Sequence, residues 1–101
     1  MPDFFLKRVA PRPRFAMDMN EAEKAMMQEH LQYWKGRQDR GEVLMFGPVL
    51  DPAGPYGMGV IEAADEAGAR AFAGGDPALK ANCRFRCDIH PMRAVTREIK
   101  Q

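Results

Sequence analysis

The order of apolar segments along the chain predicts an α+β fold in which strand, helix, strand, strand, helix and strand follow one another. Three observations lead to this fold: a β-prone run at residues 4–9, a helical apolar pattern at residues 20–35, and a run at residues 83–90 that alternates apolar and polar side chains. Such an order is the split βαβ, or ferredoxin-like, plan. Both helices are then expected to cover one face of a four-stranded sheet.

The first strand and helix are separated by a proline-bearing segment. Residues 4–9 read FFLKRV and are expected to be a strand. Residues 12–19 are expected to be a connecting loop. The helix over residues 20–35 opens with the pattern of a capping box, an asparagine followed three places later by a glutamate. A glycine is expected to end it, either Gly36 or Gly41.

The middle of the chain predicts a hairpin and a second helix. Residues 43–50 and 58–63 are expected to be paired strands, since Gly- and Pro-rich turn residues separate them. A short, alanine-rich helix is expected over residues 65–72, with Asp65 as its cap and a glycine pair after it. Asp76, directly before a proline, is expected to begin one further helical turn.

The last strand is expected over residues 83–90, with both cysteines on its apolar face. Cys83 and Cys87 then lie roughly 13 Å apart along an extended strand. This separation is too large for a disulfide, and His90 points to the opposite face, so we expect no shared metal. Both thiols are expected to be small core residues, and no cofactor is expected.

Composition indicates one globular domain over residues 1–101, with its core at about residues 4–95. Fifteen basic and fourteen acidic residues leave a formal charge of +1, which gives no drive toward nucleic acid. No apolar run approaches the length needed to span a membrane. The beginning of the chain lacks the layout of a signal peptide, and two cysteines suit a reducing compartment. A cytoplasmic protein is therefore expected.

The strand at residues 43–50 predicts a partner, because both of its residue sets are apolar. One set holds Val43 and Met45, and the other holds Leu44 and Phe46. A single layer of helices covers only one face of a sheet, and a solvated second face is normally polar. We expect a second copy of the chain to cover it, which gives a homodimer. The alternative is that the C-terminal tail folds over the exposed face.

Five segments, in this order and at these distances, resemble the YciI-like (YCII-related) protein family over residues 4–95. They are EHLQYW, GEVLMFGPVLD, GMGVIEA, FAGGDP and IHPM, at residues 29–34, 41–51, 57–63, 72–77 and 89–92. The resemblance implies a ferredoxin-like subunit that pairs sheet to sheet as a dimeric α+β barrel. It also implies a pocket that contains a His–Asp pair, here His30 and Asp76.

The best-known activity of that family is the dehydrochlorination of a chlorinated hydroxyquinol. Its substrate is not carried over to this chain, because the long, arginine-bearing first loop departs from the family pattern. His30 is the candidate proton carrier, since an imidazole titrates near neutral pH. Asp76 would orient it. The alternative is a buried, satisfied histidine and an aspartate that only caps a helix.

An arginine cluster suggests an anionic ligand. Arg8, Arg12 and Arg14, together with Phe15, are candidate substrate-binding residues around the first loop. We expect this loop to lie at the mouth of the pocket, where Phe15 would offer an apolar contact. The alternative is that these arginines are solvated surface residues.

Two functions follow from these residues. The first is an enzyme without a redox cofactor that uses His30 and Asp76 for general acid–base chemistry of the lyase or isomerase type on a small organic molecule in a dimer pocket. The second is a dimeric, non-catalytic module that binds a small ligand and in which the same pair is structural. An enclosed pocket into which the pair converges distinguishes the first from the second.

Overall fold

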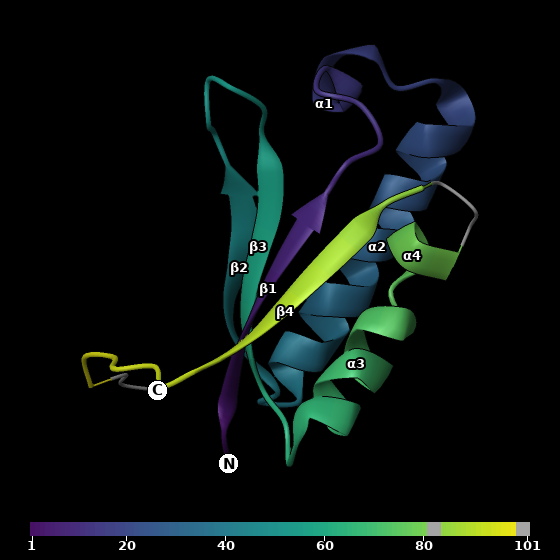
Figure 1. The fold of residues 1–101 in the computed structure, drawn as a ribbon. Coiled ribbons are helices and arrows are strands. Elements are labelled where there is room, and N and C mark those ends of the chain that lie inside the picture. Colours follow the sequence, from purple (N-terminus) through teal and green to yellow (C-terminus); the bar gives the residue numbers. More distant parts are fainter. Residues whose placement is uncertain (81–83, 99–101) are drawn as a thin grey trace.

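The computed structural model describes residues 1–80 and 84–98 and contains the predicted elements in the predicted order (Figure 1). The elements are β1 (Asp3–Val9), α1 (Phe15–Asp18), α2 (Glu21–Asp39), β2 (Val43–Val49), β3 (Tyr56–Glu62), α3 (Glu66–Gly74), α4 (Pro77–Lys80) and β4 (Arg86–Met92).

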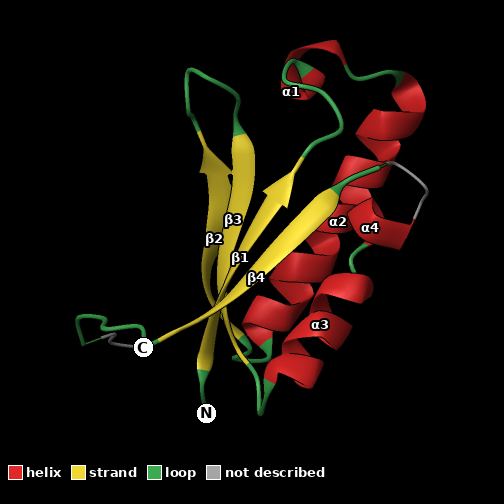
Figure 2. Ribbon diagram, in the orientation of Figure 1, coloured by secondary structure: helices red, strands yellow, loops and turns green. Residues whose placement is uncertain are grey.

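The four strands form one antiparallel sheet with the order β2-β3-β1-β4. The first and third strands of the chain lie at the centre, as the ferredoxin-like plan requires. Helices α2, α3 and α4 lie together on one face of the sheet (Figure 2). The α+β, ferredoxin-like prediction is therefore confirmed.

The helix boundaries follow the predicted caps. Asn20 accepts a hydrogen bond from the Glu23 amide, and the Glu23 side chain accepts one from the Asn20 amide. Helix α2 runs through Gly36 and ends before Gly41, whose φ of 82° is the left-handed conformation that glycine adopts without cost. Asp65 caps α3 by accepting from the Gly68 amide.

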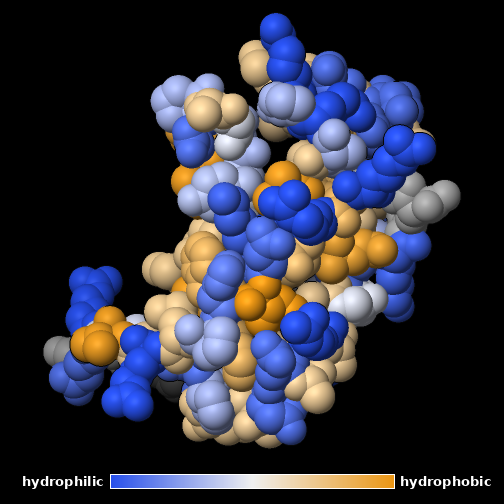
Figure 3. All heavy atoms as spheres, in the orientation of Figure 1, coloured by the Kyte–Doolittle hydropathy of each residue, from blue (hydrophilic) through white to orange (hydrophobic). Residues whose placement is uncertain are grey.

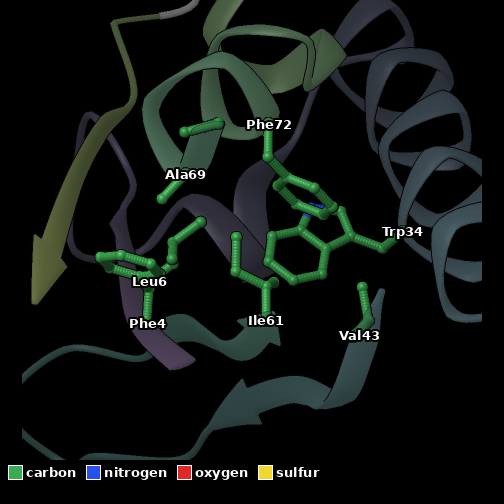
Figure 4. Close-up of a cluster of buried hydrophobic side chains, with 8 residues drawn as sticks. Phe4, Leu6, Trp34, Val43, Ile61, Ala69 and Phe72 are labelled. Carbon is green, nitrogen blue, oxygen red and sulfur yellow. The ribbon is translucent and has the colours of Figure 1, made fainter. Parts of the chain in front are cut away.

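The main core lies between the sheet and helices α2 and α3 (Figure 4). The Trp34 and Phe72 rings meet edge to face at 4.8 Å between centroids. Trp34 also lies against Gly59 of β3, where a Cβ atom would overlap the indole ring. The buried members of this core are Phe4, Leu6, Trp34, Val43, Ile61, Ala69, Phe72 and Ala73.

Several observed ends differ from the predicted ones by one to four residues, and two differences change the secondary structure that was expected. Residues 12–19 are not a plain loop, because residues 15–18 form the short helix α1. The last strand begins at Arg86, because Arg84 has a φ of 62°, which extended strands exclude. Cys87 is half-buried against the core as predicted, whereas Cys83 lies outside the described residues.

The side chains of strand β2 do not alternate regularly between the two faces of the sheet. Its register with β3 shifts between Val43 and Met45, so that Val43 pairs with Ile61 and Met45 with Val60. This β-bulge turns Val43 into the core beside Phe46, and it leaves Met45 56% exposed. The sheet still keeps apolar side chains on the face that carries no helix among the described residues.

That second face borders the C-terminal segment. The Ala94 amide donates a hydrogen bond to the Asp3 carboxylate, which fixes the start of the segment beside β1. Residues 94–97, together with Met45, Val60 and Met92, line a cavity of about 530 Å³. The segment then runs away from the sheet (Figure 1). In the described part of the chain, every helix is too short or too polar to cross a bilayer.

Candidate active site

The two residues of the predicted pair come together although 46 positions separate them in the sequence. His30 lies in the middle of α2, and Asp76 lies in the turn between α3 and α4. The His30 Nδ1 atom is 2.8 Å from both carboxylate oxygens of Asp76. The two residues are only 5% and 2% exposed. A buried ion-pairing geometry of this kind fixes the position of the imidazole ring.

Asp76 also accepts hydrogen bonds from two other groups. The Trp34 Nε1 atom donates to one carboxylate oxygen at 2.8 Å, and the Ala78 amide donates to the other at 2.9 Å. Burial raises the pKa of Asp76, but the bond and charge of His30 and the two further donors outweigh it, so the net pKa lies below the ordinary value. Asp76 is therefore an ionised carboxylate that caps α4 and orients His30 at once.

The His30 ring borders a cavity. Since Nδ1 is held by Asp76, Nε2 is the ring nitrogen left to contact a ligand, and no hydrogen bond within the described ranges engages it. The cavity measures about 250 Å³ and lies between α2 and strands β1, β2 and β3. Its lining residues are Arg8, Met27, His30, Leu31, Phe46, Gly47, Pro48 and Met58.

Arg8 is the cation of this cavity. It is on β1, opposite Gly57 of β3 and Cys87 of β4, on the face of the sheet that carries the helices. Its guanidinium lies where a Cβ of Gly57 would be and 5.9 Å from the Phe85 ring centroid. Burial lowers the pKa of Arg8, and the charge of Asp76 offsets part of this effect.

The other predicted ligand-binding residues are placed differently. Arg12 bonds both oxygens of Glu23 and one of Asp18, so its guanidinium ties the first loop to α2. Arg14 is exposed and precedes α1. Phe15 is buried and packs edge to face on Phe85 at 5.0 Å.

The first loop nevertheless lies beside the cavity. Arg12, Pro13 and Phe15 line a second, smaller cavity of about 110 Å³ that shares Arg8 and Met27 with the first. Figure 3 shows a hollow between the β2–β3 loop and the segment that leaves β1, where a third cavity of about 310 Å³ opens. The loop therefore borders the approach to Arg8.

Two residues of the site were missed by sequence reasoning. Trp34 lies one helical turn after His30, and this i, i+4 spacing could have indicated a second donor on the same face. The Arg8 guanidinium occupies the space that a side chain at position 57 would fill, and no local sequence pattern indicates this role of Gly57. Among the described residues, no three His, Cys, Asp or Glu side chains converge as metal ligands would.

The fold and the site define a class: small α+β, ferredoxin-like subunits with a cavity lined by a half-buried arginine and by a histidine that a buried aspartate holds. The chain belongs to the YCII-related domain family, whose model matches residues 4–93. Among curated proteins, none matches the sequence.

A solved structure shares the fold. It is the 5-chloro-2-hydroxyhydroquinone dehydrochlorinase TftG from Burkholderia phenoliruptrix AC1100 in complex with 2,5-dihydroxybenzoquinone, to which this chain is 18% identical. The superposition has a TM-score of 0.66 and covers 89% of this chain and 93% of that chain. The family and the α+β fold are thus established for this protein.

Proposed function

We propose that the protein is a small-molecule enzyme in which His30 transfers a proton and Asp76 positions it. The observation that carries the proposal is the arrangement of one imidazole: Nδ1 is fixed by a buried carboxylate, and the same ring borders a cavity. A general base must reach its substrate while a neighbour stabilises its charged form. The structural relative, a dehydrochlorinase, supports chemistry of this type.

The reaction class is an elimination or isomerisation. His30 Nε2 accepts a proton from carbon or oxygen of the ligand, and Asp76 stabilises the imidazolium that results. In an elimination, the electron pair left behind forms a double bond while the leaving group departs with its own bonding pair. In an isomerisation, the imidazolium returns the proton to another atom. Neither route needs an oxidant or reductant.

The size of the cavity suits a ligand of about one ring. An apolar protein cavity of about 150 Å³ holds benzene, whereas the cavity at His30 measures about 250 Å³. Phe46, Leu31 and Met27 supply apolar walls, and His30 and Arg8 supply the polar groups. Such a mixture of walls and few polar groups is typical of sites for small molecules.

The functional unit we propose is a homodimer whose sheets pack face to face. Met45 is 56% exposed, Met92 is 39% exposed and Val95 is 93% exposed, all at the face or tail that carries no helix in the described part of the chain. A broad apolar face of a sheet requires a cover. Sedimentation at micromolar concentration tests this, and a monomer that stays in solution would contradict it.

A non-catalytic binding module is the second candidate. It is favoured by one observation: protein donors occupy both oxygens of Asp76, which is also what a purely structural pair would show. Such a module would bind its ligand without any need for the proton of His30.

The experiment compares turnover and binding in matched variants. Chloride release from 5-chloro-2-hydroxyhydroquinone measures elimination. Deuterium uptake by cyclohexanone in D₂O measures proton abstraction. His30→Asn and Asp76→Asn should abolish turnover, whereas Asp65→Asn, which changes a capping aspartate remote from the cavity, should retain it. Turnover that survives in both His30→Asn and Asp76→Asn, or a wild-type protein that binds 2,5-dihydroxybenzoquinone and turns over nothing, favours the module.

A further inference from the structure

We propose that Arg8 binds the negatively charged oxygen of the ligand, so that the cavity at His30 selects small organic anions over their neutral isosteres. The inference rests on the proposed function, since it names the ligand class of that same cavity. It differs from an arginine rim on the surface, because Arg8 points into the side of the sheet that the helices cover.

The position of Arg8 follows from strand alternation. Phe4 and Leu6 lie on the same face of β1 as Arg8, and both are buried in the core. A valine or leucine would continue this pattern, but the chain places a cation there. Gly57, the neighbour on β3, leaves the space that the guanidinium fills.

The Arg8 guanidinium has no hydrogen-bond or ion-pair partner within residues 1–80 and 84–98. Its Nε atom is buried without a hydrogen-bond acceptor, and no carboxylate of the described residues lies within ion-pairing distance of it. Arginine side chains that are partly withdrawn from water, as Arg8 is, are ordinarily paired, because burial of an unpaired charge destabilises the fold. A cation that has no direct ion-pair partner among the described residues and lies beside a cavity is therefore what a site for an anion requires before its ligand binds.

Arg12 provides the contrast. Its guanidinium already bonds Glu23 and Asp18 at 2.8 to 2.9 Å, which leaves little capacity for a ligand. Arg8, by comparison, lines both the cavity that contains His30 and the smaller one beside Phe15. A ring whose oxygen bonds Arg8 therefore occupies the space that the His30 ring borders.

The test uses benzoate and its neutral isostere benzamide as probes, with inorganic phosphate as a third. We expect the full-length protein to bind benzoate about 10- to 100-fold more tightly than benzamide in calorimetric titration, the range that one charge-assisted pair supplies. Arg8→Met should remove this preference. Arg70→Gln, which removes an exposed helical arginine, should keep it.

Gly57→Ala is a second test, which displaces the Arg8 guanidinium without removing its charge. Its new methyl group would take the space of the guanidinium, and because the displaced atoms end a flexible side chain, the fold should persist. The benzoate preference should fall at least 10-fold although Arg8 is still present. An unchanged preference in both Arg8→Met and Gly57→Ala would overturn the proposal.

Other outcomes assign the anion elsewhere. If His30→Asn loses the preference and Arg8→Met keeps it, the imidazole binds the anion and the proposal is wrong. If the wild type binds phosphate as tightly as it binds benzoate, the assignment to an organic anion is wrong. The proposal is also overturned if the wild type binds benzoate and benzamide with equal affinity. Turnover is a separate readout: a benzoate preference that depends on Arg8, without any turnover, contradicts the proposed enzyme and leaves this inference standing.

Discussion

Replacement of Asp76 by alanine should destabilise the protein far more than loss of an ordinary helix cap. The carboxylate accepts from His30 Nδ1, Trp34 Nε1 and the Ala78 amide. All three donors would lose their acceptor, while the carboxylate itself is 2% exposed. Asp76→Ala therefore breaks a buried network and not only a cap.

The magnitude follows from these donors. A buried donor left without a partner costs about 1–3 kcal/mol, and removal of one member of a buried ion pair costs about 3–5 kcal/mol. We expect about 3–5 kcal/mol for Asp76→Ala, since the released cost of burying the carboxylate offsets part of the sum. Asp65→Ala, the matched exposed cap at α3, should cost about 1 kcal/mol.

Urea denaturation followed by circular dichroism and by tryptophan fluorescence measures both variants. Trp34 is the single tryptophan and it bonds Asp76, so its emission should also report the lost hydrogen bond in the native state. A free energy of unfolding for Asp76→Ala within about 1 kcal/mol of that for Asp65→Ala would refute the reasoning, because the buried bonds would then contribute nothing.

The same network predicts the direction of the pH dependence. The pKa of Asp76 is lowered in the folded protein from its ordinary value of 3.8. Stability from the ionised carboxylate is thus complete above that value and is lost as the pH falls through the lower, folded pKa. The free energy of unfolding should decline less steeply below about pH 4 in Asp76→Asn than in the wild type, and equal slopes would contradict the assignment.

Three further predictions concern the rest of the fold. Burial raises the pKa of Cys87 to about 11, an effect that the charge of Arg8 partly offsets. In a Cys83→Ser variant, alkylation of Cys87 at pH 8 should therefore be roughly 10- to 100-fold slower than alkylation of free cysteine. A rate equal to that of free cysteine would contradict the raised pKa. Gly59→Ala should cost about 1–3 kcal/mol, since its methyl overlaps the rigid Trp34 ring, whereas Gly47→Ala meets no atom within 4 Å and should be nearly neutral in thermal unfolding. The nine-residue helix α3 should open more readily than the nineteen-residue α2, so its amide hydrogens should exchange faster. Stronger protection of the α3 amides would show this expectation to be wrong.

Local chemistry in the sequence determined the elements and most of their ends. The capping box at Asn20, the cap at Asp65 and the turn after Asp76 each depend on residues within three positions of one another, so no tertiary contact was needed to find them. The alternation around Cys87 likewise indicated which face of β4 meets the core. His30 and Asp76 were found through their family resemblance, not through local spacing.

Residue-level placement needed the tertiary structure, because it depends on neighbours that are distant in the sequence. The bulge that separates Val43 from Met45 depends on the pairing of β2 with β3, and a one-residue shift reverses every later side chain. Arg8 and Arg12 are four residues apart in one basic segment, yet one lies over Gly57 beside the cavity and the other is held by Glu23. Strand alternation places Arg8 on the core face, but the side chain has the same charge at both positions, so only the partners that folding brings to each arginine decide which one is left for a ligand.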